Sequence, residues 1–429
     1  MQRPRLLLLT TAHSYRNEAF QAAAAQAGVE ILVAYDLPPA MQGEERPHRS
    51  GWLGVDLDDP EAAAESIAAA IAAETADGSA EQPLAAVLPV DDSGVMAAAA
   101  VAAGLGLPYN APAAAEAARD KYRMRTLMAA AGVPCPWFRL FSTGDDFGAI
   151  AGEMPYPCVV KPTTLNGSRG VMRADTPQEF VTRAQRLARL LRHEFGAGPH
   201  PFLVESFIPG VEVALEGMLD GGELTVLALF DKPDPLDGPF FEETIYTTPS
   251  RLPPAVQAAI AACAVQAAAA IGLQTGPIHA ELRVNDAGPW LLEVAGRSIG
   301  GLCGRTLRFD YGGAAMSLEE LIVRQACGLP WRSSSPSTGA SGVMMIPIPE
   351  AGQLRGVDGI PQAEAVPGVE GVEISVALHH TVTPLPEGES YLGFIFARGE
   401  TPAAVEASLR EAHGKLRFTI VPEIDLSLG

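Results

Sequence analysis

Short apolar runs alternate with helical patterns over the first 110 residues. The runs are continuous rather than alternating, and the segments between them are rich in Ala and Glu at helical spacing. Continuous apolar strands that alternate with helices indicate a parallel sheet covered on both faces. No GxGxxG follows the first strand, so the dinucleotide-binding fingerprint is absent. The predicted strands are 5–10, 30–36, 52–59 and 85–92, and the predicted helices are 15–28, 60–74 and 93–103.

The pattern changes to a strand-rich one after residue 119. An amphipathic helix is predicted over 119–131, and Gly132-Val133-Pro134 ends it. Two later strands, 276–284 and 289–295, are separated by Asn285-Asp286-Ala287-Gly288, which predicts a hairpin. The other predicted elements in this part are strands at 137–141, 201–207, 211–219 and 223–230, a basic helix near 177–193 and a helix at 253–272.

A Ser-rich, Gly-containing stretch at 333–342 reads as a linker. The block after it is rich in Val, Gly and Pro and ends in a predicted helix, 401–414, and a last strand. A chain of 429 residues is too long for one ordinary core. We therefore predict three domains, at 1–118, 119–331 and 343–429.

Composition narrows the classes of partner. A hydrophobic content of 48% is typical of a soluble globular protein, and a net charge of −21 argues against nucleic acid. The apolar stretch 95–107 is shorter than a membrane span, so we expect no membrane partner. The start of the chain carries only a four-residue leucine run, which predicts a strand rather than a targeting segment. Five cysteines without CxxC spacing indicate core residues in a reducing compartment, and we expect a cytoplasmic location.

The segment VVKPTTLNGSRGV, residues 159–171, is the first candidate for chemistry. An apolar β-branched strand ends on Lys161, and a loop rich in Gly and hydroxyl groups follows it. Backbone N–H groups and hydroxyls of such a loop suit an anion, and a lysine supplies a point charge for phosphate. The lysine precedes the loop, so this is not a Walker motif. Taken alone, the loop fits a solvated turn equally well.

Glu281 and Glu293 are a sharper signal. They stand twelve positions apart, one on each arm of the predicted hairpin, inside the apolar contexts HAEL and LLEV. Two carboxylates in such surroundings repel each other unless a cation lies between them. Mg²⁺, a hard ion that prefers oxygen ligands, is the natural candidate. A buried ion pair with Arg283 or Arg297 is the alternative.

These pieces occur in one order over about 175 residues: ARDKY at 118–122, the loop after Lys161, VESFIPGVEV at 204–213 and HAEL with LLEVAGR. The combination resembles the ATP-grasp superfamily from about residue 110 to 330. The C-terminal block is most similar to that of the L-amino acid ligases. The resemblance implies an ATP-grasp fold of mixed α/β and α+β class. It also implies an N-terminal parallel α/β domain and a small C-terminal α+β domain.

The resemblance also assigns roles to positions of this chain. Lys121 and Lys161 look like the two phosphate lysines, and Ser168 lies in the loop that closes over ATP. Arg297 matches the arginine that steadies the reacting groups. Ala295 departs from the pattern, because many members have Asn there to complete the metal site; a second Mg²⁺ would have fewer protein ligands. The remaining assignments are Ser206 and Ile208 on adenine through their backbones, Glu205 beside them, Glu212 on ribose, and Glu281 and Glu293 on Mg²⁺, with Mn²⁺ as an alternative ion.

The activity that the resemblance implies is ATP-dependent ligation of a carboxylate to an amine through an acyl phosphate. The partners are then small-molecule acids and amines, with amino acids as the expected substrates and a homodimer as an allowed assembly. Three alternatives stay open: a biotin-carboxylase-like carboxylase, a nucleotide-binding regulator without catalysis, and a serine hydrolase. In the hydrolase hypothesis Ser298 is the nucleophile, because GRSIG matches the motif G-x-S-x-G.

Two sets of residues are candidates for substrate contacts. Glu243 lies with Lys232 and Glu242 in an acidic and aromatic loop, and the two glutamates could equally form a solvated face. Arg305, with Arg308, could hold a substrate carboxylate or pair with Asp310. The eight histidines do not have the spacing of metal ligands. His279, two positions before Glu281, is interpreted as a core histidine whose ring nitrogens are hydrogen-bonded.

Overall fold

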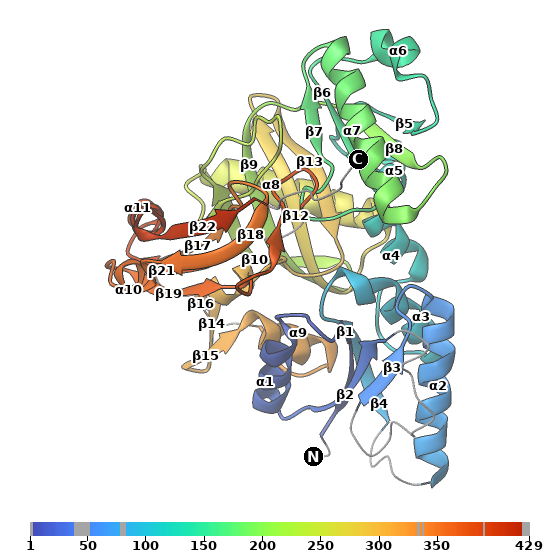
Figure 1. The fold of residues 1–429 in the computed structure, drawn as a ribbon. Coiled ribbons are helices and arrows are strands. Elements are labelled where there is room, and N and C mark those ends of the chain that lie inside the picture. Colours follow the sequence, from blue (N-terminus) through green and yellow to red (C-terminus); the bar gives the residue numbers. More distant parts are fainter. Residues whose placement is uncertain are drawn as a thin grey trace.

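The structure is a computed structural model that describes residues 3–37, 52–77, 83–332, 335–336, 339–388 and 391–422. Figure 1 shows a central group of strands with three regions around it: the N-terminal sheet below, the sheet that carries α7 above, and the C-terminal strands to the left. Each region brings part of the chain to the centre, where the candidate site lies.

The N-terminal region forms the parallel sheet that the apolar pattern predicts. Its strand order is β3-β2-β1-β4, and every neighbouring pair is parallel. Leu6 and Leu8 of β1 pack in the core that contains α1, whereas Leu7 and Leu9 pack in the core that contains α2 and α3. Burial on both faces explains why the run is apolar without alternation. The elements are β1 (Arg5–Thr11), α1 (Asn17–Ala27), β2 (Glu30–Asp36), β3 (Trp52–Val55), α2 (Pro60–Asp77), β4 (Leu84–Pro89), η3 (Asp92–Gly94) and α3 (Val95–Leu105).

The predicted helix 119–131 corresponds to α5 (Lys121–Ala130). A second helix, α4 (Pro112–Arg119), precedes it, with one residue between the two. Asp120, between them, has φ −93° and ψ 109°, and its carboxylate accepts a hydrogen bond from the Arg123 N–H at 2.7 Å. This N-cap places Lys121 at the first position of α5.

A four-stranded antiparallel sheet carries the strand that ends on Lys161. Its order is β5-β8-β6-β7, and α7 packs on β6 and β7 through buried Phe180 and Leu187. The elements are β5 (Phe138–Ser142), α6 (Phe147–Ile150), η4 (Ala151–Glu153), β6 (Cys158–Pro162), β7 (Met172–Ala174), α7 (Pro177–Phe195) and β8 (Pro201–Ser206).

An eight-stranded sheet forms the centre of the molecule, in the order β13-β12-β9-β10-β11-β17-β21-β19. The predicted hairpin is confirmed, with Asn285 paired to Gly288 at its turn. β11 pairs with β17, so this sheet continues from the second predicted domain into the third. The domain boundaries themselves stay predictions. The strands are β9 (Val211–Asp220), β10 (Glu223–Lys232), β11 (Ile245–Thr248), β12 (Gly276–Asn285), β13 (Gly288–Ala295), β17 (Ala340–Ile346), β19 (Val369–Ile374) and β21 (Gly393–Gly399).

Smaller elements complete the described chain. The sheets β15-β14-β16 and β20-β18-β22 lie beside the central strands, and α9 packs against α1. The predicted linker 333–342 falls partly outside the described residues, and β17 begins within it. These elements are η5 (Cys303–Thr306), β14 (Arg308–Tyr311), β15 (Ala314–Ser317), α9 (Leu318–Ala326), β16 (Ser335–Pro336), β18 (Gly352–Asp358), α10 (Ile360–Glu364), β20 (Thr381–Val382), α11 (Pro402–Lys415) and β22 (Arg417–Val421).

α8 (Pro254–Ile271) is the one helix of the described chain that is long and apolar enough to cross a membrane. It is longer than the apolar stretch 95–107, on whose length the expectation of no membrane partner rested. Ile260, Cys263 and Ala267 of α8 are buried in a core shared with β9, β12 and β13. One face of α8 therefore packs in this core, and a third of the helix is buried.

Gly210 connects β8 to β9 at a point where no other residue fits. Its φ is +127°, and a Cβ added there would lie 2.2 Å from the Val284 carbonyl oxygen. The glycine therefore permits a close approach between this turn and β12.

We predict that Gly210→Ala lowers the free energy of unfolding by about 1–3 kcal/mol, because positive φ and a backbone clash act together. Gly104→Ala is the matched control, since nothing lies within 4 Å of its added Cβ in α3. That change should be neutral or raise the free energy by about 0.4–1 kcal/mol. Denaturant unfolding followed by circular dichroism measures both, and equal midpoints for Gly210→Ala and wild type would contradict the assignment.

Candidate active site

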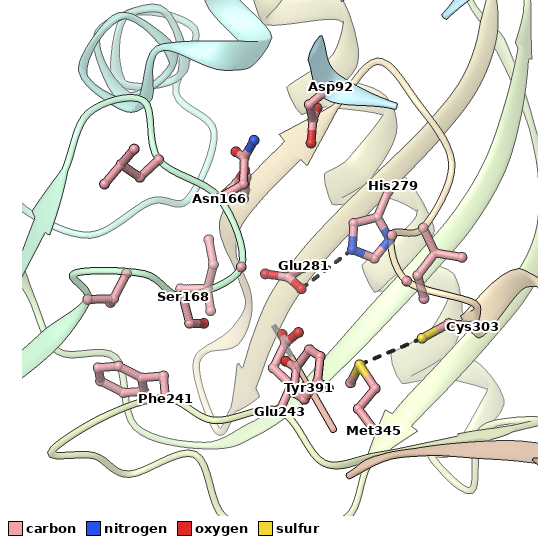
Figure 2. A pocket seen from close by; sticks show the side chains of 18 of the residues that line it. Asp92, Asn166, Ser168, Phe241, Glu243, His279, Glu281, Cys303, Met345 and Tyr391 are labelled. Atoms are coloured by element: carbon pink, nitrogen blue, oxygen red, sulfur yellow. Dashed lines mark hydrogen bonds and ion pairs between the residues drawn. The ribbon is translucent and has the colours of Figure 1, made fainter. Parts of the chain in front are cut away.

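One cavity of about 700 Å³ lies where the N-terminal sheet, the β6–β7 loop, the central sheet and the C-terminal strands meet. Figure 2 shows Ser168 and Phe241 at one end of it, Cys303 and Met345 at the other, and Glu281 between them. All predicted site residues except Arg305 line this cavity. They come from segments far apart in sequence: Lys121, Lys161, Ser168, Glu205, Ser206, Ile208, Glu212, Glu243, Glu281, Glu293 and Arg297.

The two glutamates of the hairpin lie directly opposite each other. Glu281 of β12 and Glu293 of β13 are register partners, at the edge of a bulge in the ladder. Glu281 accepts from the Lys232 ammonium at 2.9 Å, and Glu293 lies 3.4 Å from the Lys121 ammonium. About a quarter of each side chain is exposed, 22% and 27%, toward the cavity that both line. Arg283 and Arg297, the predicted alternative partners, bind Glu212 and Asp92 instead.

Lys161 and Arg125 share one buried carboxylate. Glu205 accepts from both cations at 2.6 Å, and its side chain is 3% exposed. Burial opposes ionisation of Glu205, but the charges of Arg125 and Lys161 outweigh it and hold the pKa of Glu205 below its ordinary value. Burial lowers the pKa of Lys161, and Glu205 opposes that shift. Glu205 therefore fixes the Lys161 ammonium at the cavity wall.

Arg125 positions Glu205 beside the cavity, and it was not identified from the sequence. It lies four positions after Lys121 on α5, so both side chains leave the same face of the helix. Lys121 donates to the Leu165 carbonyl at 2.9 Å, and its own N–H donates to the Thr163 carbonyl at 2.9 Å. α5 thus supplies one cation to the loop and another to Glu205. The i, i+4 spacing within RDKYRMR is the signal that could have identified it.

The loop after β6 has a backbone that few residues can adopt. Gly167, Ser168 and Gly170 have φ of 61°, 58° and 75°. The Gly170 N–H donates to the Pro386 carbonyl at 2.8 Å, and Arg169 Nε donates to the Glu387 carbonyl at 2.9 Å. The loop is therefore attached to a segment of the C-terminal region that lies more than 200 positions later.

Glu387 is held in turn by α7. Arg186 donates to both of its carboxylate oxygens, at 2.6 and 2.7 Å. The hydrogen bond from Arg186 holds the pKa of Glu387 below its ordinary value. Since the same residue accepts from Arg169 through its carbonyl, the Arg186 pair steadies the position of the loop.

The stretch 205–212 includes Ser206 and Ile208, which both line the cavity and differ in their backbone hydrogen bonds. The Ser206 N–H donates to the Trp137 carbonyl at 2.9 Å, whereas the Ile208 N–H has no acceptor in the described part of the chain. The Ile208 carbonyl accepts from Arg283 at 2.9 Å. Glu212, predicted to hold ribose, accepts from Lys232 at 2.8 Å and from Arg283 at 3.0 Å, so both of its oxygens already bind cations.

Lys232 lies behind the cavity wall among three carboxylates: Glu212, Glu243 and Glu281. These three are close enough to bind a metal ion, but the Lys232 ammonium contacts all of them. Burial disfavours the ammonium, yet the three negative charges raise the pKa of Lys232 well above its ordinary value. Burial and the charge of Glu281 raise the pKa of Glu243 to about 7. Glu243 thus lines the cavity and Lys232 contacts Glu243 from behind, whereas Glu242 does not line the cavity.

His279 supports Glu281 from behind. Its Nδ1 contacts Glu216, and its Nε2 lies 3.4 Å from Glu281. Burial lowers the pKa of His279, but the charge and hydrogen bond of Glu216 outweigh it and raise the pKa to about 9. The other oxygen of Glu216 accepts from the Ile299 N–H at 2.9 Å. The buried imidazole thus has a partner at each ring nitrogen, as the sequence suggested, and it also lines the cavity next to Glu281.

Arg297 reaches the cavity from the end of β13. Its Nε donates to Asp92 of η3 at 2.7 Å, and its Nη1 donates to the Ser298 carbonyl at 2.9 Å. Burial lowers the pKa of Arg297, but the charge and hydrogen bond of Asp92 outweigh it and raise the pKa above its ordinary value. The N-terminal sheet thus orients a cation supplied by the central sheet.

Arg305 is the predicted site residue that the structure places elsewhere. It forms an ion pair with Glu373, half of its side chain is exposed, and its guanidinium lies 4.4 Å from the Phe396 ring centre. Arg308 lies 3.8 Å from Glu370 rather than at a substrate pocket. The prediction failed because the acids that pair with both arginines lie more than 60 positions later in the sequence.

Ser298 does not have the geometry of a hydrolase nucleophile. It is 2% exposed, and its hydroxyl accepts from Arg16 at 2.9 Å. β13 ends at Ala295, and the short helix η5 begins only at Cys303, so no sharp turn connects a strand to a helix at the serine. The G-x-S-x-G match therefore reflects a loop at the contact with the N-terminal sheet.

Two segments of the chain match models of known protein families. Residues 154–306 match the family model of the ATP-grasp domain, and residues 344–421 match that of the L-amino acid ligase C-terminal domain 2. The chain thus carries an ATP-grasp domain followed by an L-amino acid ligase C-terminal domain. Its fold is similar to the crystal structure of L-amino acid ligase from Bacillus licheniformis, with a TM-score of 0.77, 23% identity, and coverage of 98% of this chain and 100% of that one.

The chain matches its sequence relatives over only part of their length, and two of the three relatives described here are named ligases. The chain is 27% identical to D-alanine–D-alanine ligase of Aromatoleum aromaticum over 50% of this chain and 71% of that protein. It is 31% identical to alanine–anticapsin ligase of Bacillus subtilis over 46% of this chain and 44% of that protein. The match to an uncharacterised Sinorhizobium fredii protein, at 28% identity, covers 75% of this chain and 65% of that protein. The matches thus cover between 44% and 71% of the length of these three relatives.

We predict that Glu387→Gln increases the rate of tryptic cleavage after Arg169, because the Arg186 pair no longer steadies the loop. Both side chains are partly exposed, so the pair is worth about 0.2–1 kcal/mol, or roughly a 1.5–5-fold increase in cleavage rate. Glu153→Gln is the control, since its pair with Arg139 is also exposed but lies away from the loop. Identical cleavage rates for Glu387→Gln and wild type, measured by mass spectrometry of the fragments, would refute this anchoring.

Proposed function

We propose that the chain is an ATP-dependent carboxylate–amine ligase that forms an amide bond between amino acid substrates and releases ADP and phosphate. One observation carries the proposal. Lys121, Lys161, Glu281, Glu293 and Arg297, from four separate segments, line a single cavity. The two family matches, which place an ATP-grasp domain before a ligase-type C-terminal domain, support the same activity.

The residues present fit a divalent cation. Glu281 and Glu293 offer hard oxygen ligands from opposite strands, and both face the cavity. A metal ion held there neutralises phosphate charge and polarises the phosphoryl group when it is bound. Glu212 is bound by both Lys232 and Arg283, whereas Glu281 faces Glu293 across the hairpin, so Glu281 and Glu293 are the pair we assign to Mg²⁺.

The chain's own residues then perform positioning and charge neutralisation. A carboxylate acylates an amine poorly because its leaving group is oxide, whereas an acyl phosphate has a good leaving group. We assign Lys121 and Lys161 to the phosphates of ATP, and Arg297 to the charge that develops on the reacting groups. The loop with Ser168 covers the site and excludes water from the acyl phosphate. We assign adenine to the Ile208 N–H, beside Ser206 and Glu205.

The remaining parts of the proposal follow from this assignment. Glu212 binds Lys232 and Arg283, so a contact with ribose would require one of its oxygens to be shared. The five cysteines are all free thiols, which fits the proposed cytoplasmic location. A carboxylase that uses bicarbonate shares the nucleotide machinery and remains the second candidate. Phosphate release that depends on pairs of amino acids, with the product identified by mass spectrometry, supports the ligase; release that depends on bicarbonate supports the carboxylase.

We predict that Lys161→Ala lowers kcat/KM for ATP by about 10–150-fold, since a charge-assisted contact is worth about 1.5–3 kcal/mol. The change also leaves Glu205 with Arg125 alone, so the thermal midpoint must be measured alongside activity. Lys415→Ala is the control, because that lysine is exposed and pairs only with Glu411. Full ATP turnover by a folded Lys161→Ala protein would count against the phosphate role.

We predict that Glu281→Gln and Glu293→Gln each raise the Mg²⁺ concentration needed for half-maximal activity by at least about tenfold, because a carboxylate ligand is lost. Glu411→Gln, an exposed change on α11, should leave it unaltered. Activity titrated with Mg²⁺ after removal of metal by EDTA measures the shift. An unchanged Mg²⁺ dependence in both hairpin variants would exclude them as metal ligands.

A further inference from the structure

The end of the cavity beyond Glu281 is apolar, and the proposed phosphoryl chemistry does not use it. Figure 2 shows Cys303, Met345 and Tyr391 together at this end, next to Glu243. The apolar wall is drawn from three separate parts of the chain: Tyr15 after β1, Ile299 and Cys303 after β13, and Met345, Val376, Tyr391 and Phe394 in the C-terminal region.

Packing holds this wall in place before any ligand binds. Phe394 and Met345 are each 4% exposed, and Cys303 Sγ lies 3.8 Å from Met345 Sδ. The Phe394 ring centre lies 6.5 Å from that of Tyr15 and 6.4 Å from that of Tyr391. A preformed apolar surface loses little conformational entropy on binding, so it can contribute affinity for an apolar group.

Charged groups border the apolar wall on the side of the reaction centre. Glu243 and Arg297 line the same cavity, and Asp91 lies at the carboxyl end of β4. In the order β3-β2-β1-β4 the chain adds β2 and β3 on one side of β1 and β4 on the other. Open α/β sheets bind small ligands at such a reversal of strand order, here between β1 and β4. The ligand that fits this end has charged groups toward Glu243 and Arg297 and an apolar group toward Phe394.

We propose that this end binds the side chain of one of the two substrates, and that this substrate is an amino acid with an apolar side chain of leucine, methionine or phenylalanine size. The inference rests on the proposed function and names its substrate class. A negatively charged side chain would be buried there against Phe394 and Met345 and beside Glu243, which is costly. Alanine would leave the wall without contacts, which forfeits dispersion energy and apolar burial.

The test uses Tyr15→Ala, because Tyr15 is 55% exposed and its loss should cost little stability. ADP release is measured with L-alanine as one substrate and L-leucine, L-phenylalanine, L-alanine or L-glutamate as the other. We expect kcat/KM for leucine and phenylalanine to fall by about 10-fold or more, the scale of apolar side-chain discrimination, and that for alanine to change by less than about 3-fold. Trp52→Ala is the matched control, since Trp52 is also an exposed aromatic residue of the N-terminal region but packs on Tyr35.

A second variant fills the pocket instead of opening it. Val376 is half-buried at the wall, and Val376→Trp should abolish use of phenylalanine while alanine is still used. Tandem mass spectrometry of the product shows whether the apolar residue enters as the acid or as the amine, and either order supports the pocket. An unchanged ratio of leucine to alanine kcat/KM in both variants would overturn the proposal.

A binding measurement separates this inference from the proposed function. With Mg²⁺ and ADP present, leucine should raise the thermal midpoint of the wild-type chain more than alanine does, and Tyr15→Ala should remove that difference. If no amino acid pair releases ADP, the ligase proposal fails, yet the leucine-specific shift still supports the apolar pocket. Equal shifts for leucine and alanine would overturn the pocket whatever the activity.

Discussion

Buried carboxylates at the centre of this protein each require a cation, and that requirement holds its separate regions together. Glu205 lies between Arg125 of α5 and Lys161 of β6, and Glu212 lies between Lys232 of β10 and Arg283 of β12. Removing one partner of a buried pair costs about 3–5 kcal/mol, because it leaves a charge in an apolar setting. The strands can therefore be displaced relative to one another only at the cost of breaking charge pairs.

The same principle separates the carboxylates that hold the structure from those that face the cavity. Glu205 and Glu212 have side chains no more than 8% exposed, and each binds two cations. Glu281 and Glu293 are about a quarter exposed and face cavity space. Each of these two also contacts a lysine, and Glu293 contacts Lys121, which we assign to phosphate. A nucleotide with its metal ion can take over both partners of that contact without leaving a charge unpaired.

The sequence predicted features that depend on neighbours in the chain. The parallel sheet follows from continuous apolar runs, the hairpin from its Asn-Asp-Ala-Gly turn, and the Glu281–Glu293 pair from matching places on two arms. Contacts between segments that are remote in sequence could not be predicted from local patterns. The extension of the central sheet through β11 and β17 crosses the predicted linker, and Arg305 is paired with Glu373. Lys232 was ambiguous in the sequence for the same reason, since its three acids come from three strands or loops.

One C-terminal stretch contacts both ends of the cavity. Val376 and Phe394 form part of the apolar wall, while Pro386 and Glu387, between them in sequence, hold the loop that carries Ser168. In the proposed reaction, water must be excluded at both ends for an acyl phosphate to survive until an amine reaches it. Because a single stretch supports the loop and the wall, a shift of that stretch would open both ends together. The C-terminal region is thus a structural part of the site, and the central sheet that it extends gives it a rigid base.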